Sequence, residues 1–161
     1  MRTKLRISIV SVLVALAGGA LVTTTASSQT VLRVVLSPQA GLRAAVIDIN
    51  NDGLRLGDRI AARGPLFDET QTDRLGTAYL HCHVHRRIIQ PDRGLWNCNY
   101  VLELKGGDVV LQGLDPRGPG AYDVAVLGGT GAYAGASGAA TFEDVGTDAD
   151  GYTDMTISLS G

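Results

Sequence analysis

Two neighbouring runs of sequence decide the fold: LGTAYLHCHVH at Leu75–His85 and LWNCNYVLEL at Leu95–Leu104. Side chains alternate between the two faces of a β-strand, so each run divides into an apolar face and a polar face. The apolar faces carry Ala78, Leu80, Cys82 and Val84 in the first run, and Trp96, Cys98, Tyr100, Leu102 and Leu104 in the second. Pairing the runs with Cys82 opposite Cys98 keeps the two apolar sets on one face. We expect that face to be the interior of a barrel.

Short β-patterned runs continue on both sides of this pair, and turn signals separate them. The eight predicted strands are Leu42–Ile49, Arg59–Leu66, Leu75–His85, Leu95–Leu104, Val109–Leu114, Tyr122–Leu127, Ala134–Glu143 and Tyr152–Ser160. The segments between them are rich in Gly, Asn, Asp and Pro, the residues that turns favour. Eight short strands at this spacing predict an all-β domain, either a sandwich or a closed barrel.

The first residues of the chain predict export. Met1–Arg6 is basic and has no acidic residue, Ile7–Val22 is nearly all apolar, and small polar residues follow. This order is typical of a cleaved secretory signal, and the apolar run is shorter than the roughly 20 residues that span a bilayer. We therefore expect a signal peptide at residues 1–26, a lead-in segment at 27–41 and one secreted barrel domain at 42–161, with no membrane attachment after cleavage.

Charge and cysteine content narrow the partners and the compartment. The chain has 14 basic and 16 acidic residues, and removal of the basic signal leaves it more acidic still. That balance argues against nucleic acid as a partner, because nucleic acids are held by clustered Lys and Arg. The only two cysteines, Cys82 and Cys98, lie in the exported part, where disulfides persist.

A series of motifs follows the order of the predicted strands. It runs from Gly57-Asp58-Arg59-Ile60 through Leu66-Phe67, Arg74-Leu75-Gly76, Cys82 and Leu111-Gln112-Gly113 to the segment VLGGTGAYAGASG at Val126–Gly138. In this order the motifs resemble the allene oxide cyclase family and, more distantly, the plant dirigent proteins. The resemblance covers most of residues 46–142. It implies an eight-stranded antiparallel barrel with a mostly apolar cavity, commonly assembled as a homotrimer.

The glycine-rich part of the last motif also looks superficially like a phosphate-binding loop. However, no helix is predicted after it and no Lys follows its glycines, so a nucleotide site is not expected. We predict no cofactor.

The resemblance implies a catalytic set as well. Cyclases of this family fold an apolar epoxide in the lumen, near a carboxylate, an amide-held water and a cavity cysteine. The matching positions here are Asp48, Asn50 and Cys82. A spacing of two residues places Asp48 and Asn50 on one strand face. The predicted ligand cavity is lined by Ala78, Leu80, Val84, Trp96, Tyr100 and Leu102.

Each of these assignments has an alternative. Asp48 and Asn50 directly precede a turn, so they can instead begin a solvated loop. Cys82 is either a free thiol or half of a disulfide with Cys98, and the shared strand face in an exported protein favours the disulfide. Trp96 and Tyr100 fit ordinary core positions equally well.

The predicted function is that of a secreted barrel that binds an apolar small molecule and steers its cyclisation or isomerisation. Two positions depart from the family pattern: the expected asparagine is absent near Gly64, and the expected tyrosine is absent after Gln112-Gly113. These departures favour the alternative of a non-catalytic, dirigent-like or lipocalin-like binding barrel.

Three histidines alternate along one face of a central strand, at His81, His83 and His85. Adjacent pairs at this spacing are able to chelate Zn²⁺ or Cu²⁺. The alternative that we favour is a polar outer face, solvated or in a subunit contact, so the histidines are weak metal candidates and no metal centre is predicted.

Overall fold

A computed structural model describes residues 29–37, 40–49, 51, 55–87, 94–116, 120–146 and 151–161. The predicted signal peptide at residues 1–26 and the candidate amide Asn50 lie outside these residues. Within the described ranges, no helix is long and apolar enough to cross a membrane.

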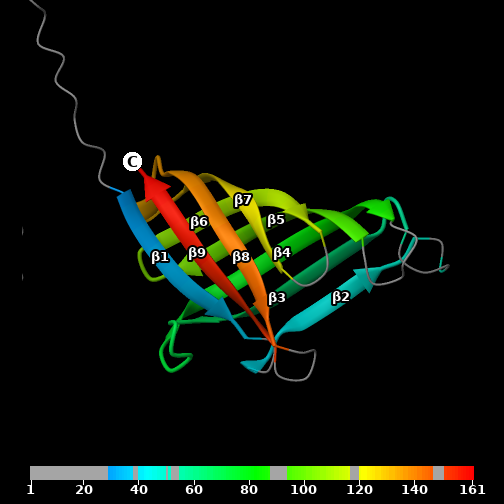
Figure 1. The fold of residues 1–161 in the computed structure, drawn as a ribbon, viewed down its shortest axis with the longest axis horizontal. Helices are drawn as coiled ribbons and strands as arrows, with labels where there is room; N and C mark the ends of the chain where they lie inside the picture. The colour runs from blue at the N-terminus through cyan, green and yellow to red at the C-terminus, as the bar shows by residue number, and fades with distance from the viewer. Residues whose placement is uncertain are drawn as a thin grey trace, which may run out of the picture.

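The described residues form nine antiparallel strands in one sheet (Figure 1). The strands are β1 Gln29–Leu36, β2 Arg43–Ile47, β3 Arg59–Phe67, β4 Arg74–Arg87, β5 Gly94–Leu104, β6 Gly107–Asp115, β7 Gly120–Gly129, β8 Ser137–Val145 and β9 Tyr152–Ser160. They are hydrogen-bonded in the order β1-β9-β8-β7-β6-β5-β4-β3-β2. Pairing of Val35 with Phe67 and of Leu36 with Leu66 joins β1 to β3 and closes the ring. The predicted eight-stranded antiparallel barrel is therefore confirmed.

The first strand of the closed barrel is not the strand that the sequence predicts. β1 lies within the expected lead-in segment, yet it pairs with β9 along its whole length and belongs to the barrel. The predicted first strand is instead β2, an exposed ninth strand paired with β3 (Figure 1). Strands of a closed barrel are tilted and staggered. Because of this stagger, β1 reaches only the end of β3, and β2 occupies the rest of that edge.

Alternate residues of the ring strands fill the interior. The most deeply buried of them include Leu66, Ala78, Cys98, Leu102, Val109, Leu111, Ala140, Phe142, Met155 and Ile157. β4 and β5 pair in the predicted register, with Cys82 opposite Cys98 and His81 opposite Asn99. The division of both strands into an inner apolar face and an outer polar face is thus confirmed.

The glycine-rich segment links β7 to β8 through a single 3₁₀ turn, η2, at Gly131–Tyr133. Thr130 ties this link to the β5–β6 turn: the Asp108 N–H donates to its Oγ1, and its own N–H donates to the Asp108 carbonyl, both at 2.9 Å. Gly131 has a φ of +56°, and a Cβ there would collide with the Gly106 carbonyl oxygen. The glycine therefore serves the close approach of two turns.

A buried carboxylate ties the loop after β2 to the barrel. Asp58 is 1% exposed and accepts hydrogen bonds from the backbone N–H groups of Ile49 at 3.0 Å and Arg55 at 2.7 Å. The carbonyl of Asp58 in turn accepts a hydrogen bond from the Val84 N–H at 2.9 Å. Asp58 therefore fixes the path by which the chain leaves β2 and enters β3.

We expect Asp58→Ala to lower the free energy of unfolding by about 2 kcal/mol, because two N–H groups lose their acceptor. Urea unfolding followed by the fluorescence of Trp96, the single tryptophan of the chain, measures this loss. The exposed Asp73 offers a matched control, and Asp73→Ala is expected to stay within about 0.5 kcal/mol of the parent. Equal stabilities of the two variants would contradict the role of Asp58.

Candidate functional site

A cavity of about 450 Å³ lies at the end of the barrel where β8 turns into β9. Its wall is mainly apolar and is contributed by Leu36, Leu42, Ala44, Ile60, Ala62, Leu80, Cys82, Trp96 and Val145, while Asp115, Asp144, Tyr152 and Thr153 add polar groups. Ala44 on β2 is exposed, so solvent reaches the cavity along this strand. A largely apolar cavity with a few polar groups is typical of a site for a small organic molecule.

A smaller hollow of about 70 Å³ borders the main cavity on its inner side. The two hollows share five lining residues, namely Leu36, Leu80, Asp115, Asp144 and Thr153. The smaller hollow adds the buried or half-buried side chains of Tyr100, Tyr122, Phe142 and Met155. A ligand in the main cavity would therefore meet two phenols at its inner end.

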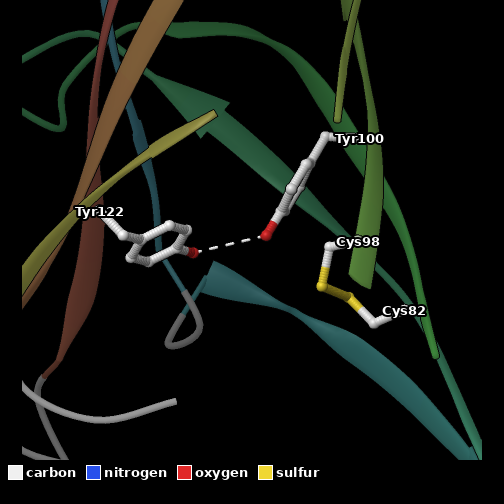
Figure 2. Close-up of a disulfide and its surroundings, with 4 residues drawn as sticks. All are labelled: Cys82, Cys98, Tyr100 and Tyr122. Carbon is white, nitrogen blue, oxygen red and sulfur yellow. Dashed lines mark hydrogen bonds between the residues drawn. A yellow bond between two sulfur atoms is a disulfide. The ribbon is translucent and has the colours of Figure 1, made fainter. Parts of the chain in front are cut away.

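The two phenols come from different walls of the barrel, Tyr100 from β5 and Tyr122 from β7, and point toward each other (Figure 2). Their hydroxyl oxygens are 3.4 Å apart, and Phe142 packs against both rings. Burial raises the pKa of Tyr122 far above its usual value, and the neighbouring Tyr100 and Asp115 add to the rise. The Tyr122 phenol therefore stays protonated and offers a hydrogen bond rather than a negative charge.

Two carboxylates lie beside these phenols. Asp115 ends β6 on its inner face, opposite Trp96, and is only 7% exposed. Asp144, near the end of β8, is exposed and accepts a hydrogen bond from Thr153 Oγ1 at 2.8 Å. A carboxylate in an apolar wall stabilises positive charge that develops on a bound molecule, and a protonated phenol stabilises a ligand oxygen.

Cys82 and Cys98 form a disulfide across β4 and β5, with their Cα atoms 4.0 Å apart (Figure 2). The predicted bridge is therefore present. Cys82 lines the cavity, as the resemblance implies, but it does so as half of the disulfide. The alternative of a free thiol at Cys82 does not hold in this structure.

The predicted acid, Asp48, is half-buried and directly follows β2. Among the described residues, it is not one of those that line the cavity, and its predicted partner Asn50 lies outside them. Within the part of the chain that the structure describes, the carboxylates at the cavity are those of Asp115 and Asp144. A catalytic role for Asp48 and Asn50 stays a prediction.

The other predicted lumen residues all lie on the inner face of β4 or β5 but differ in depth. Leu80 and Trp96 line the main cavity, and Tyr100 lines the inner hollow. The remaining three, Ala78, Val84 and Leu102, are buried in the core.

His81 and His83 lie on the outer face of β4, away from the cavity, and His85 is exposed at the β-bulge between Val84 and Arg86. His81 and His83 are neighbours, with ring centroids 4.7 Å apart. Partial burial lowers the pKa of His83, and the nearby His81 and Arg59 contribute to the decrease. The described residues contain no group of three or more His, Cys, Asp or Glu side chains placed to hold a metal ion.

Sequence reasoning missed Asp115 and Tyr122 as lumen residues. A signal for both was available, because alternation from Val109 along β6 leads inward to Asp115, and Tyr122 shares the face of Val124 on β7. Asp115 also stands directly before a proline, which made it look like part of a turn.

The fold of the chain is similar to the β-barrel folds of solved dirigent proteins and cyclases. No protein-family model matches the chain, and no curated protein matches it in sequence. The similarity is therefore one of structure, and it is shared with enzymes of different chemistry.

Three solved structures illustrate the range of similar barrels. The pterocarpan synthase dirigent protein PsPTS1 has a TM-score of 0.67 at 16% identity, over 83% of this chain and 95% of that chain. Pyocyanin demethylase has a TM-score of 0.62 at 22% identity, over 80% of this chain and 99% of that one. The Diels–Alderase AbmU from Streptomyces koyangensis has a TM-score of 0.62 at 10% identity, over 85% and 70% of the two chains. Identities this low establish the fold alone.

Proposed function

We propose that this protein binds an apolar small molecule in its lumen and steers the cyclisation or isomerisation of that molecule. The observation that carries the proposal is the apolar cavity that holds Asp115 and leads to the Tyr100–Tyr122 pair. The similar structures support it, because they include a pterocarpan synthase and a Diels–Alderase.

The chemistry needs little more than these groups. A cyclisation that is an isomerisation needs no second reactant, because it neither adds nor removes atoms. A cavity that holds the bound molecule in a folded conformation brings its reacting atoms together and so supplies much of the rate enhancement. Tyr122, kept protonated, would donate a hydrogen bond to a ligand oxygen on which negative charge develops. Asp115, which lines the same hollow as Tyr122, would stabilise positive charge that develops nearby on the bound molecule.

We also propose that the protein acts outside the cytoplasm and assembles as a homotrimer. Export is supported by the basic, apolar and small-residue order of the first residues and by the disulfide. The trimer rests on the resemblance to the cyclase family alone. Native mass spectrometry of the protein recovered from culture medium tests both, because it reports the assembly, the loss of residues 1–26 and any retained ligand.

A non-catalytic binding barrel is the second candidate. The position of Asp48 favours this candidate. The family resemblance implies that Asp48 is the catalytic acid, but Asp48 is not among the described residues that line the cavity. Comparison of the ligand retained by the parent with that retained by Tyr122→Phe separates the two candidates. If the protein is a cyclase or isomerase, the variant retains an unconverted isomer of the same mass and a different chromatographic retention time, whereas two binding barrels retain the same molecule.

Binding in the lumen is tested with the neutral apolar dye N-phenyl-1-naphthylamine, whose fluorescence rises in apolar surroundings. We expect Ala44→Phe to weaken dye binding by about tenfold or more, because the added ring enters the cavity from its rim. The matched control is Ala45→Phe, since Ala45 is the adjacent exposed residue of β2 on its other face. Equal affinity in the two variants, or no dye binding by the parent, would count against a ligand-binding lumen.

A further inference from the structure

Two histidine rings lie side by side on the outer wall of the barrel. The rings of His81 and His83 have centroids 4.7 Å apart and an interplanar angle of 76°. His81 is exposed and His83 is half-buried, so both are reachable from solvent. The two residues occupy alternate positions of β4, which is paired on both sides, with β3 and with β5. Their backbone positions are therefore held by a ladder on each side.

We propose that His81 and His83 together bind a divalent transition-metal ion, Cu²⁺ or Zn²⁺, on the outer face of β4. Imidazole nitrogen lies about 2.0–2.1 Å from such an ion, so each ring centroid lies about 3.2 Å from it. Two rings on one ion then have centroids roughly 4.5 Å apart at a right angle and roughly 5.2 Å apart at the tetrahedral angle. The observed separation of 4.7 Å falls between these limits, so rotation of the rings out of their present edge-to-face arrangement would turn a nitrogen of each toward one ion without moving the backbone.

The residues around the two histidines determine the metal affinity of the site and the remaining ligands of the ion. The described residues offer no third His, Cys, Asp or Glu ligand, so water would complete the coordination of the ion. Arg59, on β3, pairs in register with His83, and its positive charge opposes a bound cation. Asn99 and Asn97 are the corresponding β5 neighbours of His81 and His83 and bring no charge. We therefore expect micromolar affinity rather than the tighter binding of a site with four protein ligands.

This site is separate from the lumen. Cys82 and Val84 alternate with the two histidines and point inward, so the metal and an apolar ligand would occupy opposite sides of the same strand. The metal proposal therefore neither needs nor supports the proposed function.

Equilibrium dialysis of the untagged full chain against Cu²⁺ or Zn²⁺ alone tests the site. We expect one ion per chain at micromolar concentration, and a weakening of about tenfold or more in each of the variants His81→Gln and His83→Gln. His85→Gln is the matched control: His85 is the unpaired residue at the β-bulge between Val84 and Arg86, outside the regular register of the other two histidines, so its loss is expected to leave the affinity unchanged. Arg59→Gln is expected to tighten binding several-fold, since it removes the opposing charge.

Three results of these experiments would contradict the proposed metal site. No stoichiometric binding by the parent at micromolar metal, or binding that survives both His81→Gln and His83→Gln, would overturn it. Loss of binding in His85→Gln equal to that in His83→Gln would also contradict a two-histidine site. Circular dichroism of each variant verifies the fold, which substitution at these outward-facing positions is expected to preserve.

Discussion

Phe142→Ala is expected to lower the free energy of unfolding by about 3–5 kcal/mol, the largest effect of any single substitution considered. The side chain is 1% exposed, and its removal leaves a cavity in the barrel interior, continuous with the smaller hollow that it lines. It also removes edge-to-face contact with Tyr100, at a centroid distance of 4.9 Å, and tilted contact with Tyr122, at 5.6 Å. Urea unfolding measures the loss.

Glu143→Ala is the control for this substitution, because Glu143 is the next residue of β8, exposed on the outer face. It is expected to change stability by no more than about 0.5 kcal/mol. Phe142→Leu keeps most of the volume and yields a measurement if the alanine variant does not fold. A loss below about 1 kcal/mol in Phe142→Ala would mean that the phenol pair does not depend on this ring for its packing.

Removal of the disulfide, by the paired substitution Cys82→Ala and Cys98→Ala, is expected to lower the free energy of unfolding by about 3 kcal/mol. The bridge closes a loop between cysteines 16 positions apart, and its loss releases the unfolded chain from that constraint. Urea unfolding of the parent and the paired variant, each followed by Trp96 fluorescence, gives the difference.

Reductant provides the control. Dithiothreitol is expected to destabilise the parent and to leave the paired alanine variant unchanged, because the variant has no cysteine left to reduce. Thiol titration of the unfolded parent is expected to detect thiols only after reduction. Free thiols in the unreduced parent, or a stability difference below about 1 kcal/mol, would argue against the bridge as a major source of stability.

The features that sequence predicts correctly are those set by local periodicity. Alternation along Leu75–His85 and Leu95–Leu104 was sufficient to place Cys82 opposite Cys98, because a shift of one residue would have exchanged the inner and outer faces of one strand. The turns are also predicted from local sequence, since Gly, Asn and Pro favour turns through their own backbone preferences.

The feature of the fold that sequence missed depends on closure of the ring. β1 and β2 are both short, β-patterned and close in sequence, and nothing local shows which one meets β9. That choice follows from the stagger of the whole barrel. Asp115 was missed for a different reason: local alternation places it on the inner face of β6, but only if the strand extends past Gly113 to its end opposite Trp96, and the following Pro116 indicated an earlier turn.

The pairing of β1 with β9 has a consequence for how the chain reaches this fold. Gln29 pairs with Ser160, so the ring brings together the two most distant strands of the described sequence. Contacts between such remote segments carry a high loop-closure cost and slow folding. The ring therefore cannot close while β9 is still being synthesised, and each nascent chain stays open until then. An open chain is also the form that can be threaded across a membrane, so this topology is compatible with the export proposed above.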